Sequence, residues 1–78
     1  MFLTNKLSIR ADGVGDLYRC ADKLARGEIN LGMDFFKMAK EKVGNLMKMD
    51  LDKDKVLENQ LYWAEMVLDE YMRLKRIV

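Results

Sequence analysis

Three aspartates at alternate positions form the clearest group of metal-binding side chains in this sequence. Asp50, Asp52 and Asp54 have the spacing of the first carboxylates in an EF-hand calcium loop. That loop also requires a glycine at its sixth position and a bidentate glutamate at its twelfth. Lys55 and Leu61 occupy those positions here. Because both the geometry and the charge are wrong for calcium, we expect these acids to lie at the N-terminus of a helix.

Side chains for nucleophilic or acid–base catalysis are scarce. The chain contains no histidine, one serine, Ser8, and one cysteine, Cys20. Histidine is the commonest general base, and a structural zinc site needs several Cys or His ligands. Cys20 lies among apolar positions, so we expect a small buried hydrophobic side chain in a reducing compartment. The sequence therefore predicts no enzyme activity and no metal or cofactor site.

Two further patterns have ordinary structural explanations. Gly13-x-Gly15 lacks the third glycine and the following lysine of a phosphate-binding loop, so we expect a turn there. The neighbouring acids Asp69 and Glu70 lie on a predicted solvated helix face. We interpret them as surface charge and not as a catalytic pair.

Length and charge place the chain among small globular domains. A chain of 78 residues forms one domain, and at this size only about 60% of the unfolded surface becomes buried. The net charge of +1 gives no overall attraction to nucleic acid or to an anionic membrane. The N-terminus lacks the features of a secretory signal, and no apolar stretch approaches the ~20 residues of a membrane span. We expect a cytoplasmic protein that does not enter a membrane.

The N-terminal residues give the least certain secondary-structure signal. Leu7, Ile9 and Ala11 alternate with polar residues, which favours an extended conformation. The glycines and aspartates over 12–16 then interrupt any regular element. We predict an extended arm and turn over residues 1–15.

Helical patterns occupy the remainder of the chain. Asp16 is a suitable N-cap, and Gly27 suits the left-handed position after a helix, so the first helix is predicted over 17–26. Apolar periodicity predicts a second helix over 29–47 and a long third helix over 54–77. The expected fold is all-α, a small three-helix domain with a long C-terminal helix.

The predicted third helix carries two apolar stripes. The first steps by four and three residues and consists of Leu57, Leu61, Ala64, Leu68 and Tyr71. The second consists of Val56, Trp63, Val67 and Leu74. A helix that faces one core needs an apolar stripe only a little over 100° wide. Two shorter helices cannot cover both stripes, so we expect part of this surface to be buried against a partner.

This excess of apolar surface predicts a non-enzymatic interaction or regulatory module, such as an adaptor, a small inhibitor or an assembly subunit. A homodimer that forms a larger helical bundle is the favoured partner arrangement, and a different protein is the alternative. The expected interface residues are Trp63, Val67, Tyr71, Leu74 and Met66.

A small dimeric DNA- or RNA-binding regulator is the competing hypothesis. Two helices joined tightly at Gly27 could form a helix-turn-helix. The second helix, however, begins with only Asn30 suited to base contacts. The residues available for phosphate contacts are Lys37, Lys40, Lys42, Lys48, Arg73, Lys75 and Arg76.

Overall fold

The computed structural model describes the backbone of residues 2–78 and the side chains of residues 8–78. These residues form four α-helices and one short 3-10 helix, without a β-strand. The elements are α1 (Phe2–Ala25), α2 (Ile29–Val43), η1 (Gly44–Leu46), α3 (Lys53–Glu58) and α4 (Gln60–Ile77). The predicted all-α fold is confirmed.

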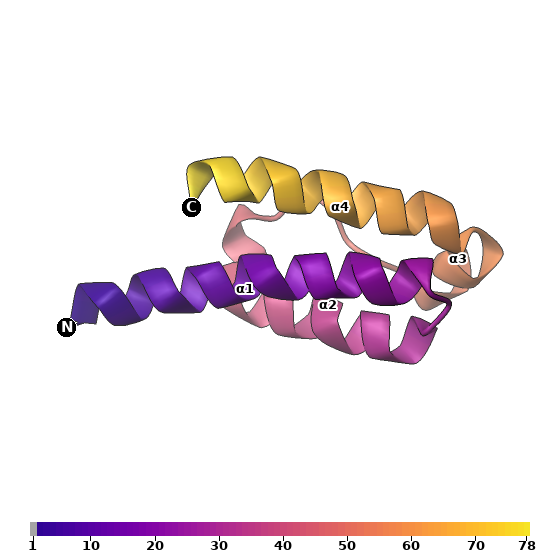
Figure 1. Ribbon diagram of the computed structural model, residues 1–78, viewed down its shortest axis with the longest axis horizontal. Helices are drawn as coiled ribbons and strands as arrows, with labels where there is room; N and C mark the ends of the chain where they lie inside the picture. Colours follow the sequence, from indigo (N-terminus) through magenta and orange to yellow (C-terminus); the bar gives the residue numbers. More distant parts are fainter. Residues whose placement is uncertain (1) are drawn as a thin grey trace.

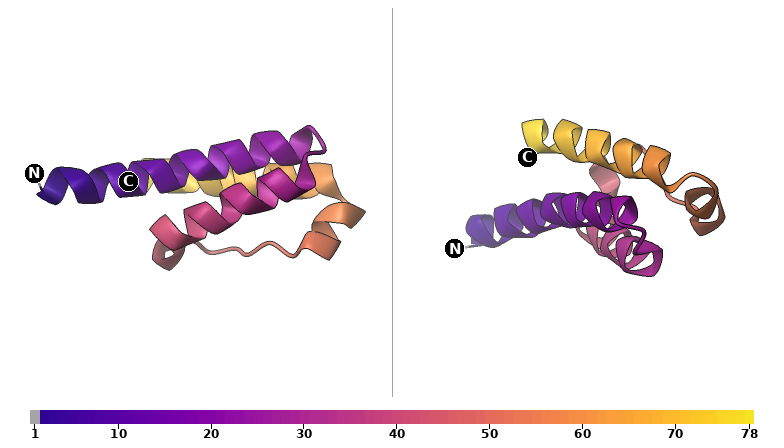
Figure 2. Two further views of the ribbon diagram at one scale, coloured as in Figure 1. Left: turned by 90° about the horizontal axis from the view of Figure 1, so that it is seen from below. Right: turned by 45° about the vertical axis from the view of Figure 1, so that its right-hand side comes forward.

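The long helix α1 lies in the middle of an elongated molecule that measures 43 × 20 × 18 Å (Figure 1). Helix α2 folds back along one side of α1, and α4 runs antiparallel to α1 on another side. An extended linker over 47–52 leads from η1 to α3 at the far end of the molecule (Figure 2). The N-terminal end of α1 projects beyond the end of α4.

The predicted extended arm over 1–15 is wrong, because α1 is continuous from Phe2. Each glycine within a helix costs about 1 kcal/mol relative to alanine, but tertiary packing outweighs this preference at Gly13. A Cβ atom on Gly13 would lie 2.9 Å from Lys42 Cβ and 3.0 Å from Val43 Cγ1. The absence of a side chain therefore lets α1 and α2 approach closely where the sequence suggested a turn.

The connection between α1 and α2 follows the local signals in the sequence. Helix α1 ends at Ala25, one residue before the predicted end, and Gly27 has a φ of 82°. The Glu28 N–H donates to the Lys23 carbonyl at 2.9 Å, which closes the helix end. The two helices consequently form a tight hairpin.

Two predicted helices have different bounds in the structure. The helix predicted over 54–77 is broken at Asn59, whose φ of −152° and ψ of 71° are not helical. The Asn59 side chain accepts a hydrogen bond from the Tyr62 N–H and begins α4 instead. The helix predicted over 29–47 ends at Val43, where the chain tightens into η1.

The core contains side chains from all four α-helices. Its fully buried large residues are Leu17, Leu24, Val43, Val56, Val67 and Leu74. Cys20 is also fully buried, as its apolar surroundings predicted. Burial raises the pKa of the Cys20 thiol to about 12, against a smaller lowering by a backbone hydrogen bond at Phe36. The thiol is therefore protonated and structural at neutral pH.

A buried carboxylate joins α1 to α2. Asp16 is only 2% exposed and accepts hydrogen bonds from Arg19 Nη1 at 2.7 Å and from Lys42 Nζ at 2.8 Å. Asp16 was predicted to cap a helix, but it lies within α1 and pairs with a lysine of α2. Two cationic partners compensate for the removal of this carboxylate from water.

A second buried carboxylate attaches the linker to α4. Glu70, predicted to lie on a solvated face, is only 7% exposed. Its oxygens accept hydrogen bonds from the Lys48 N–H at 2.6 Å and from Arg73 Nε at 2.7 Å. Arg73 also donates to the Leu46 carbonyl at 2.7 Å. This network holds the segment after η1 against one side of α4.

Two of the three alternating aspartates have structural roles through their carboxylates. Asp52 caps α3 by accepting a hydrogen bond from the Asp54 N–H at 3.1 Å, as expected for an acid at a helix N-terminus. Asp50 accepts a hydrogen bond from Lys40 Nζ at 3.0 Å, which lowers the pKa of the Asp50 carboxyl together with a bond from the Leu51 N–H.

Candidate functional site: a groove between α1 and α4

The residues predicted to contact a partner lie mostly inside the chain. Val67 and Leu74 are fully buried in the core, so in this fold they are not available to another protein. Trp63, Met66 and Tyr71 are half-buried. The linker and η1 cover part of this side of α4, which helical periodicity alone does not indicate.

Three members of the other predicted apolar stripe are exposed, whereas Ala64 is buried and Tyr71 is half-buried. Leu61 is 62% exposed and Leu68 39%, and Leu57 at the end of α3 is 58% exposed. Met72 adds a further exposed side chain on α4. The predicted excess of apolar surface therefore exists, but Leu61, Leu68 and Met72 lie on a side of α4 turned away from the buried Val67 and Leu74. Tyr71, a predicted interface residue, lies between the two sides and contacts Tyr18.

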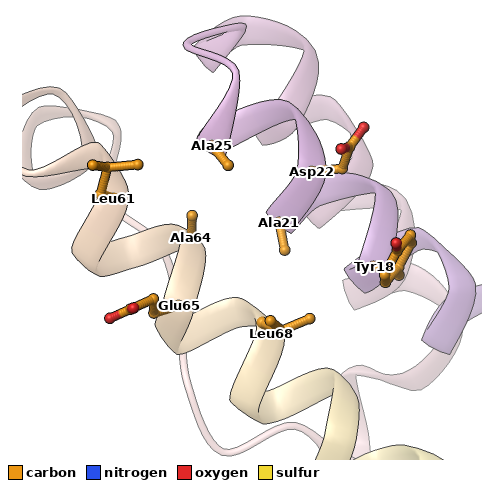
Figure 3. Close-up of a pocket in the computed structure, with 8 residues that line it drawn as sticks. All are labelled: Tyr18, Ala21, Asp22, Ala25, Leu61, Ala64, Glu65 and Leu68. Atoms are coloured by element: carbon orange, nitrogen blue, oxygen red, sulfur yellow. The ribbon is translucent and has the colours of Figure 1, made fainter.

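This surface borders a groove of about 320 Å³ between α1 and α4 (Figure 3). The methyl groups of Ala21 and Ala64 point into the space between the two helices. The larger side chains stand at the sides of the groove. The lining residues are Tyr18, Ala21, Asp22, Ala25, Leu61, Ala64, Glu65 and Leu68.

The groove follows from the residue sizes on the two helices. Small residues recur along the side of α1 that faces α4, at Ala21 and Ala25, and Ala64 faces them from α4. The aromatic rings of Tyr18 and Tyr71, one on each helix, pack with centroids 5.3 Å apart. Alanine methyl groups beside this aromatic pair leave a depression that the chain itself does not fill.

Charged groups lie at the edges of the groove. Asp22 accepts a hydrogen bond from Arg26 Nε on the same helix at 3.0 Å. Glu65 is exposed on α4, and its side chain points away from α1. Farther along α4, Lys75 Nζ lies 5.6 Å from the centroid of the Tyr71 ring. The floor is apolar and the edges are charged, which suits the binding of an amphipathic surface.

Trp63 lies at a different, shallower hollow near the junction of α3 and α4. Its ring packs edge-to-face against Tyr62, with ring centroids 5.1 Å apart. Lys55, Glu58 and Asn59 complete the lining of this hollow. Trp63 also contacts the core, so it does not belong to the groove between α1 and α4.

The basic residues considered for nucleic-acid binding are partly engaged within the chain. Lys42 pairs with buried Asp16, and Lys40 pairs with Asp50 at 3.0 Å. Arg73 pairs with Glu70, and this pairing raises the pKa of the arginine. These ion pairs reduce the positive surface that the sequence suggested for phosphate contacts.

Comparison of the chain with protein-family models, with curated proteins and with solved structures gave no match. No helix within residues 2–78 is both long and apolar enough to cross a membrane. Across the part of the chain that the structure describes, no three His, Cys, Asp or Glu side chains come together as a metal site.

Proposed function

We propose that this protein is a non-enzymatic interaction module that binds another protein surface through the groove between α1 and α4. The observation that carries the proposal is the arrangement of Tyr18, Leu61 and Leu68, three exposed large apolar side chains around a floor of alanines. Such a surface supplies apolar contact area and a shape into which a partner side chain can insert.

The energetics support this use of the groove. Complete burial of a leucine side chain is worth about 1.5–3 kcal/mol relative to full exposure. Leu61 and Leu68 forgo part of this stabilisation, and a core in a domain this small supplies only about 3–5 kcal/mol. Single exposed apolar residues are ordinary on protein surfaces, whereas contiguous ones around a hollow indicate a binding site.

Site-specific photo-cross-linking tests the proposal. Leu68 is replaced with p-benzoylphenylalanine, and Glu41, which is exposed on α2, receives the same replacement as a control. In an extract of the cells that make the protein, we expect specific adducts only from position 68. An excess of unmodified protein should suppress adducts with another protein, whereas the Leu61→Lys variant should not. Adducts with a second copy are recognised by the mass of two chains, and added unmodified protein does not suppress them because it is itself that partner.

Adducts with a second copy or with another protein both count, because the proposal concerns the surface. Equal labelling from positions 68 and 41, or labelling of another protein that Leu61→Lys suppresses as well as the unmodified protein does, contradicts it. Circular dichroism of each variant checks that the helical fold is intact.

A further inference from the structure

The exposed side of α4 has a symmetric pattern of residues. Glu65, Leu68, Met72 and Lys75 are all exposed and are separated by three, four and three positions. This spacing places the four side chains along one face of the helix. The pattern is centred on the level of residue 70. It carries an acid at one end, a base at the other and two apolar residues between them.

We infer that the partner of this surface is a second copy of the chain, with the two α4 helices packed antiparallel about a two-fold axis at the level of residue 70. This inference rests on the proposed function and identifies its partner. An antiparallel helix pair brings the two alternating positions of a heptad pattern into shared layers. Leu68 then faces Met72 of the second copy, and Glu65 faces Lys75 of the second copy, and the symmetry repeats each contact.

Other alignments of the same surface are less favourable. A shift by one heptad places Leu61 beside Met72 of the second copy, but it also places Glu65 against Leu68 of the second copy. A carboxylate buried against a leucine without a partner is costly. A parallel pair brings each Glu65 beside the other and each Lys75 beside the other, so like charges meet. The antiparallel alignment about residue 70 pairs apolar with apolar and acid with base.

Helix α1 is compatible with this arrangement. Tyr18 shares the groove with Leu68, and Ala11 lines a second hollow together with Lys75, so α1 runs beside the same part of α4. The two-fold axis at residue 70 of α4 passes α1 between Ala11 and Tyr18. The α1 helices of the two copies therefore also run antiparallel. The end of α1 that projects beyond α4 in Figure 1 lies beside the second copy.

Charge reversal in the purified protein tests the alignment. Light scattering after size exclusion, from about 10 µM to about 1 mM, should show a concentration-dependent dimer of the unmodified chain. Glu65→Lys and Lys75→Glu each place like charges in both outer layers and should weaken the dimer at least about tenfold. A 1:1 mixture of the two variants restores opposite charges in every layer, and so does the double variant. Both should dimerise.

The matched controls are Glu41→Lys and Lys37→Glu, which make the same charge changes on exposed positions of α2 and should leave the dimer unchanged. A chain that remains monomeric throughout overturns the inference, as does a mixture that fails to recover. Single variants that dimerise like the unmodified chain also overturn it. The two proposals can fail separately. A monomer that still gives adducts only from position 68 keeps the interaction surface and excludes the second copy as its partner. Equal labelling from positions 68 and 41 contradicts the proposed function itself.

Discussion

The two faces of α1 use small residues with opposite results. At the contact with α2, Gly13 of α1 and Gly32 of α2 have no side chain where the helices meet. A Cβ atom on Gly32 would lie 2.7 Å from Leu24 Cδ2 of α1. Toward α4, Ala21 and Ala64 leave a groove. The first contact is closed and contains the buried Asp16 cluster, whereas the second remains open at its outer edge.

The difference shows that small residues bring helices together only where larger neighbours permit it. A glycine at a helix–helix contact allows the two helices to approach closely, because it has no Cβ atom that would meet the neighbouring side chains. Alanines beside the tilted, packed rings of Tyr18 and Tyr71 cannot close the remaining space. The α1–α2 contact therefore supports the fold, and the α1–α4 groove is the surface that we propose for binding.

The largest expected effect is a difference in the free energy of unfolding between substitutions at two adjacent residues of α4, one buried and one exposed. Val67→Asp places an unpaired carboxylate in the core and should lower the free energy of unfolding by about 4 kcal/mol or more, enough to unfold this small domain. Leu68→Asp changes an exposed position and should alter it by less than about 1 kcal/mol. Urea denaturation at low protein concentration measures both. Similar losses for the two variants would contradict the assignment of core and groove.

The next effect compares two glycines of α1. Gly13→Ala should lower the free energy of unfolding by about 2 kcal/mol, because the new methyl group meets Lys42 Cβ on α2. Gly15→Ala should raise it by about 0.5–1 kcal/mol, because the new methyl group would lie 3.4 Å from its nearest neighbour, Arg19 Nη1, and alanine favours a helix. Thermal denaturation of the pair checks the opposite signs. If both substitutions raised the free energy of unfolding, α1 and α2 would be able to move apart at Gly13 without a loss of stability.

A smaller effect concerns the attachment of the linker to α4. Burial works to raise the pKa of Glu70, but the hydrogen bonds from Arg73 and the Lys48 N–H outweigh it and lower the pKa. The stability from Glu70 is therefore fully present above its ordinary pKa of 4.5 and is lost as pH falls through the lowered value. Glu70→Gln should cost about 1.5 kcal/mol at pH 7. Urea denaturation from pH 7 to pH 3 should show a smaller decline for this variant, and an unchanged decline would contradict the role of Glu70.

The smallest expected effect is on the chemical reactivity of Cys20. Because the Cys20 thiol is buried between helices and its pKa is raised to about 12, thiol reagents should modify it only when the chain opens. The modification rate of the folded protein should be far below that in urea. It should increase in the Gly13→Ala variant and remain unchanged or fall in the Gly15→Ala variant. Rapid modification of the native protein would show that the α1–α2 contact is less closed than its packing implies.

Local signals in the sequence predicted the features that depend on neighbouring residues. Helical periodicity gave the all-α fold, Gly27 marked the end of α1, and Asp52 caps a helix. The burial of Cys20 followed from its apolar surroundings. Each of these features is decided within a few positions along the chain, which is the range over which capping and periodicity act.

Features that depend on distant residues could not be predicted in the same way. Gly13 lies within a helix because Lys42 and Val43 pack against it. The sequence predicted two apolar stripes on one helix, but which of their residues are buried depends in part on the linker that Arg73 and Glu70 hold against α4. A usable signal was present, because Glu70 lies three residues after buried Val67, four before buried Leu74 and three before Arg73.

The buried carboxylate of Asp16 has a consequence for how the two helices are aligned. Its partner Lys42 belongs to α2, and their oxygen and nitrogen atoms are 2.8 Å apart. Sliding one helix along the other by a single turn, about 5.4 Å, would separate them and leave a buried anion with one cation fewer. Alternative packings in which α2 is shifted along α1 by one turn therefore carry an electrostatic penalty. Apolar packing alone would not impose this penalty.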